Sequence, residues 1–328
     1  MDAQRSGSVD ISVIIASRNR AGLLADTLAS VGAQLTGGAF TYEVIVADNG
    51  STDGTWALLQ ELSVRFPVPL HPVRELRPGK PHAVSTALAA ASGGIIALTD
   101  DDVAADPGWL AAVWRAFQET PADALAGRIV PAWLDGRPEW LSDEAMRHLG
   151  TLGCLDFGAE RFMANTYPKH FWWVGGNIAV KRAIIDRFGS YDVRLLRGQD
   201  VELYQRYRRS GVRVVYEPRA VVHHKIGRDR LTPEHFRAWY TRMGYFKALQ
   251  TPWQKYHLVT IVPLAWYREV GGLIAAWWRA GSAPTPQRFW KRLGYECRLR
   301  RAAAQWWHRL RWWPRGWAAA FARRSSPS

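Results

Sequence analysis

The stretch Ile95-Ile96-Ala97-Leu98-Thr99-Asp100-Asp101-Asp102 decides how this chain folds. Its first five residues are apolar or β-branched, as is typical of a strand buried on both faces. Three carboxylates follow at once, and they repel one another unless a cation is present. At a strand end, such a cluster indicates a site for Mg²⁺ or Mn²⁺ that bridges to substrate phosphates. The simpler alternative is an acidic loop before a helix that begins near Pro107.

Strands and helices alternate before and after this stretch. The patterns predict strands at 9–16, 42–47, 70–73 and 94–99, and helices at 23–31, 55–66 and 82–91. This order predicts an α/β domain with a Rossmann-like, mostly parallel central sheet flanked by helices. Ligands bind outside the carboxyl ends of the strands in such sheets, and the polar clusters 17–20, 48–53 and 100–102 follow those ends. Further on, we expect a helix at about 200–210 and strands at 212–216 and 220–224.

Charge is concentrated near the C-terminus. The chain of 328 residues has 43 Lys and Arg against 29 Asp and Glu, a net charge of +14. Residues 251–328 contain 14 of the basic residues, two acids and 10 of the 18 tryptophans. Arg alternates with Trp and Leu over 287–322, which predicts a helix with a cationic face and an aromatic face that suits a bilayer surface. The apolar runs 258–267 and 270–278 are each shorter than the roughly 20 residues of a spanning helix, so we expect a buried helix pair or an interfacial segment.

Two further features bear on the compartment. Cys154 and Cys297 are far apart and have no metal-ligand spacing, which argues against a disulfide framework or a zinc site. The first ten residues lack the apolar stretch of a signal peptide. We therefore expect a cytoplasmic protein, peripheral on the inner face of the cell membrane.

Six segments, in the same order, resemble motifs of family 2 glycosyltransferases, which have the GT-A fold. Any one of them alone is a weak signal, and together they cover roughly residues 9–245. They are Val13–Arg20, Val44–Thr55, Leu98–Asp102, Gly175–Arg182, Gly198–Leu203 with Arg206, and Val221–His224.

The resemblance implies a pocket for a nucleoside-diphosphate sugar. Asp48 would contact the base, although a turn residue bonded to its own backbone would look the same. Asp53 would either contact the donor or begin the following helix. Lys80 would either meet a phosphate or the base, or be a solvated charge in a loop. Asp101 would reach a sugar hydroxyl or the ribose. The donor-binding residues expected in this way are Ala16, Ser17, Arg18, Asp48, Lys80, Asp100 and Asp101.

The resemblance also implies a divalent cation, Mn²⁺ or Mg²⁺, held by Asp100 and Asp102, with His224 completing the site. The cation would neutralise charge that develops on the leaving diphosphate. His223 is a weaker candidate, because neighbouring strand residues face opposite sides. Lys225 and Arg228 are candidates for phosphate contacts on a closing loop.

Asp200 is the expected catalytic base, which takes the proton from the acceptor hydroxyl as that oxygen attacks the anomeric carbon. One base and a direct displacement imply inversion. The family often has Glu-Asp where this chain has Gln199-Asp200, which leaves the aspartate intact. A helix cap is the alternative for Asp200, and Glu202 is a fallback base.

Acceptor or sugar contacts are expected from Trp173, Gly176 and Asn177. Trp172 and Trp173 precede the Gly-Gly-Asn turn, and an indole there would either stack on a sugar ring or pack in the core. Gly175 and Gly176 let the backbone approach a ligand closely. The Asn177 amide could bond a sugar hydroxyl.

These observations predict an inverting hexosyltransferase. It would use a nucleoside-diphosphate sugar, UDP favoured over GDP or dTDP, and a membrane-held, lipid-linked or saccharide acceptor. Residues 1–250 would form the GT-A catalytic domain and residues 251–328 a helical, membrane-interfacial region. A catalytically inactive membrane-docked relative and a nucleotidyltransferase are the alternatives. Nucleic-acid binding is disfavoured, because the basic residues lie in the tail while the expected site is acidic.

Overall fold

The structure is a computed structural model that describes residues 9–150, 152–164, 171–195, 198–250, 264–281 and 285–322. The chain divides into two compact units. The first contains Met1–Ala132 and Gly153–Lys225, and the second contains Trp133–Leu152 and Ile226–Ser328. This division falls between residues 132 and 133, 152 and 153, and 225 and 226. The domains 1–250 and 251–328 expected from the sequence stay a prediction.

The first unit is built on one mixed sheet. Within the described residues the sheet has nine strands, in the order β3-β2-β1-β4-β8-β6-β9-β5, with β7 paired to β9. The strands are β1 (Ile11–Ser17), β2 (Tyr42–Asp48), β3 (Leu70–Arg74), β4 (Ile95–Thr99), β5 (Val103–Ala105), β6 (Ala124–Trp133), β7 (Phe162–Met163), β8 (Asn177–Lys181) and β9 (Val214–Ile226).

The two halves of the sheet differ in direction. The strands β3, β2, β1 and β4 are parallel to one another. From β4 onward the pairs β4–β8, β6–β8, β5–β9 and β7–β9 are antiparallel. The predicted α/β class is confirmed, but the expected mostly parallel order holds only for the N-terminal half.

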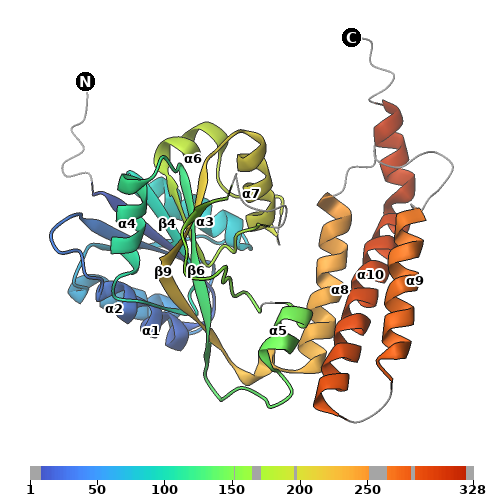
Figure 1. Cartoon of the computed structure of the whole chain (residues 1–328). Coiled ribbons are helices and arrows are strands. Elements are labelled where there is room, and N and C mark those ends of the chain that lie inside the picture. Colours follow the sequence, from blue (N-terminus) through green and yellow to red (C-terminus); the bar gives the residue numbers. More distant parts are fainter. Residues whose placement is uncertain are drawn as a thin grey trace. The chain divides into compact units, whose positions relative to one another are not determined.

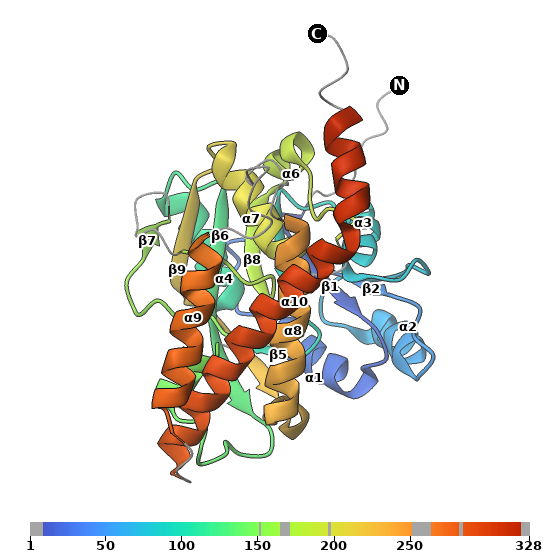
Figure 2. The ribbon, with the colours of Figure 1, turned by 90° about the vertical axis from the view of Figure 1, so that its right-hand side faces the viewer.

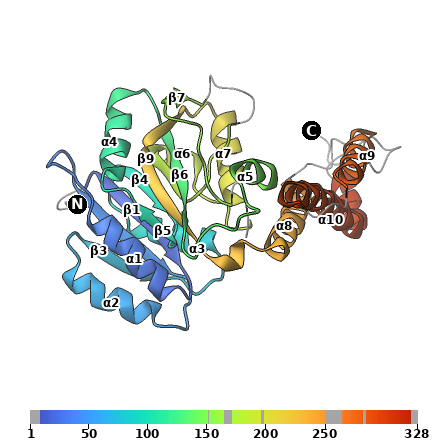
Figure 3. The same cartoon turned by 60° about the horizontal axis from the view of Figure 1, so that its bottom comes forward.

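Helices of the first unit cover the sheet. They are α1 (Ala21–Gly32), α2 (Thr55–Arg65), α3 (Lys80–Ala90), α4 (Trp109–Glu119), α6 (Arg182–Phe188) and α7 (Gln199–Arg209). Figures 1 and 3 show α1 and α2 side by side, in blue. Because β–α–β crossovers are right-handed, the reversal of direction from β3 back to β4 places α3 on the opposite face.

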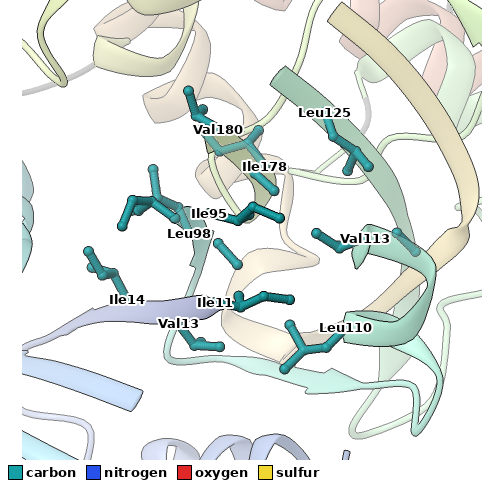
Figure 4. Packing of buried hydrophobic residues seen from close by; sticks show 14 of the residues in the cluster. Ile11, Val13, Ile14, Ile95, Leu98, Leu110, Val113, Leu125, Ile178 and Val180 are labelled. Atoms are coloured by element: carbon teal, nitrogen blue, oxygen red, sulfur yellow. The ribbon is translucent and has the colours of Figure 1, made fainter. Parts of the chain in front are cut away.

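The core of the first unit lies on both faces of β1 and β4. Ile11, Ile14 and Leu98 are fully or almost fully buried. Figure 4 shows side chains of β1 and β4 with Leu110 and Val113 of α4 and with side chains of β6 and β8. Burial on both faces explains why these strands read as continuous apolar runs.

The second unit is helical. Its helices are α5 (Asp143–Leu149), α8 (Pro233–Gln250), α9 (Leu264–Arg279) and α10 (Pro286–Ala322), with a 3₁₀ turn η1 (Arg228–Arg230). Figures 1 and 2 show α8, α9 and α10 side by side. A Cβ at Gly244 would collide with the Arg301 carbonyl, so this glycine lets α8 approach α10. Arg237 of α8 also forms an ion pair with Glu296 of α10 at 3.0 Å.

Part of the aromatic stripe of α10 lies inside this unit. Trp290, Leu293 and Trp306 are buried, so these residues of the predicted bilayer face are instead core residues. Tyr267, Ile274 and Trp278 of α9 remain exposed. No helix within the described residues is long and apolar enough to cross a membrane. Of the predicted apolar run 258–267, residues 258–263 lie outside the described part of the chain.

Candidate active site

The candidate site lies where the strands β1, β2 and β4 end. Pairing of β1 with β2 places Ser17 opposite Asp48, and Asp100 directly follows β4. Antiparallel pairing of β8 with β4 sets Asn177 opposite Thr99, which brings the Gly-Gly turn next to Asp100. Pairing of β9 with β5 sets His224 opposite Val103, and therefore next to Asp102. The sheet thus gathers the segments that sequence patterns indicated.

The three aspartates after β4 have different partners. Asp100 is partly exposed and forms an ion pair with Lys80. Asp101 is buried; its carboxylate accepts hydrogen bonds from the Ser17 hydroxyl at 2.7 Å and from Arg20 at 2.9 Å. Asp102 is also buried and accepts a hydrogen bond from the same Arg20 nitrogen at 2.8 Å. Each carboxylate is therefore near a positive charge.

Burial and charge shift the pKa values in this cluster in definite directions. Burial raises the pKa of Asp101, although Arg20 and the Ser17 hydroxyl oppose the shift. For Lys80, burial alone would lower the pKa, but Asp100, Tyr191 and Asp200 together outweigh it and the net pKa is raised. Lys80 is therefore a fixed positive charge at neutral pH.

Asp102 and His224 offer a donor pair suited to a divalent cation. The His224 Nε2 atom lies 3.6 Å from Asp102 Oδ2, and both side chains are buried. Bonds from such ions to oxygen or nitrogen are about 2.0–2.2 Å long, so two ligands of one ion lie roughly 3–4 Å apart. Within the described residues, however, no three carboxylate, histidine or cysteine side chains form a metal-binding cluster. The residue types fit a cation that takes its remaining ligands from substrate and water, while Asp100 is turned toward Lys80.

The Gly-Gly turn is shaped by its close approach to Asp100. A Cβ at Gly176 would lie 2.9 Å from Asp100 Oδ2. The Gly176 carbonyl accepts a hydrogen bond from the Thr99 hydroxyl at 2.8 Å. The backbone of this turn thus approaches Asp100 closely.

Asp200 lies at the start of α7 and is held by backbone groups. Its carboxylate accepts hydrogen bonds from the N–H of Val201 at 3.0 Å and of Gly175 at 3.3 Å. Burial raises the pKa of Asp200, against the opposing effects of the Val201 N–H and of Lys80. The side chain is only partly buried. A partly accessible carboxylate with a raised pKa has the properties of a general base.

Glu202, the fallback base, is committed elsewhere. Both of its oxygens accept hydrogen bonds from Arg206, at 2.8 and 3.0 Å. Arg206 also donates to the Ser190 carbonyl at 2.6 Å, which fastens α7 to the preceding turn. This pair supports the segment that presents Asp200.

Asp48 is completely buried at the end of β2. Its carboxylate accepts a hydrogen bond from the Ser51 N–H at 3.1 Å and lies 3.4 Å from Arg74 Nε. The turn-residue alternative for Asp48 is therefore present in the structure. Asp53 similarly accepts hydrogen bonds from the N–H groups of Thr55 and Ala21, as a helix-entry residue does.

Of the other donor-side residues, Arg18 is exposed and makes no hydrogen bond or ion pair with any described residue. It follows Ala16, which is half-buried, and Ser17, which is buried. Asn19 adopts a positive φ of 53° and its side chain accepts a hydrogen bond from the Thr52 N–H at 2.7 Å. Asn19 thereby ties the turn after β1 to the turn after β2.

Two expected sugar contacts belong instead to the interior. Asn177 is 1% exposed; its amide donates to the carbonyls of Arg128 and Ala220 and accepts from the Trp109 indole. Trp173 is fully buried, and its indole N–H donates to the Asp200 carbonyl at 2.6 Å. The expectation that these two side chains contact a sugar is therefore corrected, because burial and hydrogen bonds commit both to the interior.

The remaining candidates, on β9 and beyond it, lie in different environments. Lys225 is buried and forms an ion pair with Asp26 at 3.1 Å. Its N–H bonds the Asp102 carbonyl at 2.8 Å. His223, on the same strand, is half-buried. Arg228 lies in η1 of the second unit.

Sequence reasoning missed two residues of the site. Arg20 bridges Asp101 and Asp102; a cation in the turn after β1 was a usable signal, since three adjacent acids need positive charge. Tyr191 is buried within electrostatic range of Lys80, Asp200 and Asp100. Nothing in the sequence pattern distinguishes this tyrosine from a core residue.

The first unit has the fold of GT-A glycosyltransferases. The mannosyltransferase PcManGT from Pyrobaculum calidifontis, solved with GDP-Man and Mn²⁺, matches with a TM-score of 0.51 and 21% identity over 98% of this chain and 77% of that chain. GalNAc-T7, solved with UDP, GalNAc and Mn²⁺, matches with a TM-score of 0.53 and 18% identity over 80% of this chain and 54% of that chain.

The family model described as "Glycosyl transferase family 2" matches residues 12–188, more than half of the sequence, so the chain belongs to glycosyl transferase family 2. A glucosyl-dolichyl phosphate glucuronosyltransferase of Haloferax volcanii is 31% identical over 147 residues, 41% of this chain and 44% of that protein. A pre-mycofactocin glycosyltransferase of Mycobacterium tuberculosis is 27% identical over 273 residues, 82% of this chain and 52% of that protein. The chain spans about half the length of these relatives.

Proposed function

We propose that this chain transfers a sugar, with inversion, from a nucleoside-diphosphate sugar to a hydroxyl of an acceptor. The observation that supports this most strongly is the placement of Asp200. A partly accessible carboxylate with a raised pKa lies against Gly175, and the next residue in the chain, Gly176, lies against Asp100. A base and a diphosphate-binding acid are thus presented by the two sides of one turn.

In this proposal Asp200 accepts the proton of the acceptor hydroxyl as its oxygen attacks the anomeric carbon. The N–H groups of Val201 and Gly175 orient the carboxylate. Because the lone pairs of the attacking oxygen form the new bond while the bond to the diphosphate breaks, a single displacement inverts the anomeric centre. General-base assistance of this kind typically contributes about 10²–10⁴-fold to the rate.

Donor phosphates are proposed to bind near Asp100, Asp102 and Lys80. A divalent cation held by Asp102 and His224, with Asp100 released from Lys80, would supply Lewis-acid stabilisation of the leaving diphosphate. Lys80 would then face the phosphates as a fixed positive charge. Mn²⁺ in the solved structures of PcManGT and GalNAc-T7 supports a divalent cation.

The nucleotide is proposed to lie over the turns after β1 and β2, beside Arg18 and Asp48. We favour UDP over GDP or dTDP, since the Asp48 carboxylate can accept a hydrogen bond from a uracil N–H. A GDP-sugar is the competing donor, because PcManGT was solved with GDP-Man.

The acceptor is proposed to be lipid-linked or a saccharide, held at the cytoplasmic face of the membrane. The name of the Haloferax volcanii relative, which includes a dolichyl phosphate, supports a lipid-linked acceptor. The exposed apolar side chains of α9 and the basic residues of 251–328 support membrane contact.

The deciding experiment separates donor binding from transfer in the variant Asp200→Asn. A panel of UDP-, GDP- and dTDP-sugars with Mn²⁺ is scored by thermal shift, since the true donor stabilises the folded chain by mass action. We expect Asp200→Asn to keep that shift and to lose at least about 100-fold in sugar transfer. EDTA should remove the shift, and added Mn²⁺ should restore it.

The matched control is Asp156→Asn, which removes an exposed carboxylate paired with Arg128. This variant should keep both donor binding and transfer. Normal transfer by Asp200→Asn would exclude Asp200 as the base, and a donor shift that survives EDTA would contradict the cation. An unmutated chain that binds a donor and transfers nothing would favour the inactive-relative alternative.

A further inference from the structure

A buried polar group beside Asp200 lacks a partner. Tyr191 is 6% exposed, and its hydroxyl forms no hydrogen bond with any described residue. Leaving such a group unpaired in the interior is destabilising. An unpaired buried hydroxyl at a site is therefore a reason to look for a ligand that completes it.

Four other buried tyrosines of this chain have hydroxyls that bond to the backbone. The hydroxyls of three of them donate to backbone carbonyls, each at 2.8 Å, and that of a fourth accepts from a backbone N–H at 3.1 Å. These are Tyr42 to Val31, Tyr207 to Gly189, Tyr240 to Leu149, and Tyr216 from Phe157. The fold can evidently pair a buried phenol with the backbone, so Tyr191 is an exception among them.

The position of this hydroxyl is fixed by Gly175. A Cβ on Gly175 would lie 2.7 Å from the Tyr191 oxygen and 3.4 Å from the Asp200 Cβ. The hydroxyl thus lies against the same glycine whose N–H bonds the Asp200 carboxylate. Any larger residue at 175 would cover it.

The surroundings of the hydroxyl are charged and partly open. The phenol lies within electrostatic range of Lys80, Asp200 and Asp100. The side chains of Lys80 and Asp100 are 29% and 32% exposed, so the cluster reaches the surface. Burial, the largest influence, raises the pKa of Tyr191, so its hydroxyl stays protonated at neutral pH and can donate a hydrogen bond.

A second unpartnered atom lies next to the base in the sequence. The side-chain oxygen of Gln199 is buried and accepts no hydrogen bond from the described part of the chain. An amide oxygen only accepts, whereas a phenol can donate. A sugar hydroxyl can do both, so it could pair with a group of either kind.

We propose that Tyr191 is a substrate-contacting residue whose hydroxyl bonds a hydroxyl group of a sugar, either the transferred sugar or the acceptor sugar, beside Asp200. The inference rests on the proposed sugar transfer. It adds a specificity-determining contact to that function, because a substrate that lacks the hydroxyl would leave the phenol unpaired.

The test is Tyr191→Phe in the full chain, which removes one oxygen and keeps the ring. Because that oxygen has no partner in the fold, we expect an unchanged or slightly higher Tm. We expect a roughly tenfold loss in transfer to octyl glucoside, with the nucleotide sugar that stabilises the unmutated chain most. Donor hydrolysis is measured alongside.

The matched control is Tyr207→Phe, which deletes a hydroxyl that is bonded to a backbone carbonyl in the same region. It should lower Tm by about 2–4 °C and leave transfer unchanged. A Tm loss in Tyr191→Phe equal to that of the control would show a structural hydroxyl and overturn the proposal. Unchanged transfer in Tyr191→Phe would overturn it as well.

Two supporting outcomes distinguish the source of the sugar hydroxyl. Weaker donor binding in the thermal-shift titration would assign it to the transferred sugar. Unchanged donor binding with slower transfer to octyl glucoside, and normal donor hydrolysis, would assign it to the acceptor. Failure of the unmutated chain to transfer any sugar would count against the proposed function itself.

Discussion

Asp100, Asp101 and Asp102 are adjacent in the chain but lie in different environments. Asp101 faces the end of β1, where Ser17 and Arg20 bind it. Asp102 faces Arg20 and His224, and Asp100 faces Lys80. The three residues therefore have separate roles in the proposed site. Arg20 bridges Asp101 and Asp102, while Lys80 pairs with Asp100.

Asp200 gives a prediction about pH. Its folded pKa is raised by burial, so the protonated form is favoured in the folded state. Protonated Asp200 therefore contributes to the free energy of unfolding. This contribution is complete below the pKa of Asp200 in the unfolded chain and is lost as pH rises through its folded pKa. At pH 7 the charged carboxylate thus destabilises the fold, and Asp200→Asn should raise Tm, on the order of 2 °C.

Thermal melts of both proteins between pH 8 and pH 4 measure this effect. The difference in Tm should shrink as pH falls through the raised pKa, because the unmutated side chain becomes neutral too. In kinetics, kcat/KM should fall on the acid side at a pH above the usual value of about 4 for aspartate. A constant or reversed difference in Tm would show that Asp200 is stabilised as an anion.

At the scale of elements, the contact between β6 and its neighbours depends on Gly127. A Cβ there would lie 2.5 Å from the Ala220 carbonyl oxygen of β9 and would collide with the Asn177 amide of β8. That amide joins β8 to β6, β9 and α4 through the carbonyls of Arg128 and Ala220 and the Trp109 indole. The glycine and the asparagine form one packing unit beneath the Gly-Gly turn.

Gly127→Ala should accordingly destabilise the chain by about 2–4 kcal/mol, through overpacking and the loss of buried hydrogen bonds. Urea denaturation measures it. The control is Gly22→Ala in α1, where a new Cβ meets nothing within 4 Å. That change should stabilise slightly, since alanine is the better helix former. Equal stability of Gly127→Ala and the unmutated chain would refute this account of the packing.

At the scale of the whole molecule, the two units differ in chemistry. The first presents acidic and basic residues at its strand ends. The second combines net positive charge with an exposed apolar stripe on α9 formed by Tyr267, Ile274 and Trp278. These positions are spaced by seven and four residues, so they lie on one helix face. Arg268 and Arg279, on the same helix, would meet anionic headgroups.

The proposed membrane contact predicts that charge placed on this stripe weakens binding to membranes. We expect Ile274→Asp with Trp278→Asp to lower sedimentation with phosphatidylglycerol vesicles about tenfold, because burial of these side chains in the interface is lost. The control Val64→Asp changes a still more exposed apolar residue, in α2 of the first unit, and should bind as before. Undiminished sedimentation of the double variant would exclude α9 as the contact.

Local patterns in the sequence were sufficient for several parts of this protein. Apolar runs with polar residues at their ends predicted β1, β2, β4 and the helices between them. The burial of a strand and the polar residues at its end both depend on residues that are consecutive in the sequence. The same patterns selected Asp100 and Asp102 for the proposed site, and the resemblance to the family's motifs selected Asp200. The basic, tryptophan-rich character of residues 251–328 is likewise a property of composition alone.

Only the tertiary structure decided where long-range pairings place side chains. The antiparallel register of β9 with β5 brings His224 to Asp102, and that of β8 with β4 buries Asn177. Packing of α10 on α8 turned Trp290 and Trp306 into core residues. The fold also places Tyr191 near Lys80, Asp100 and Asp200. Such contacts join residues tens of positions apart, and sequence periodicity reports only which face of an element is apolar, not what that face meets.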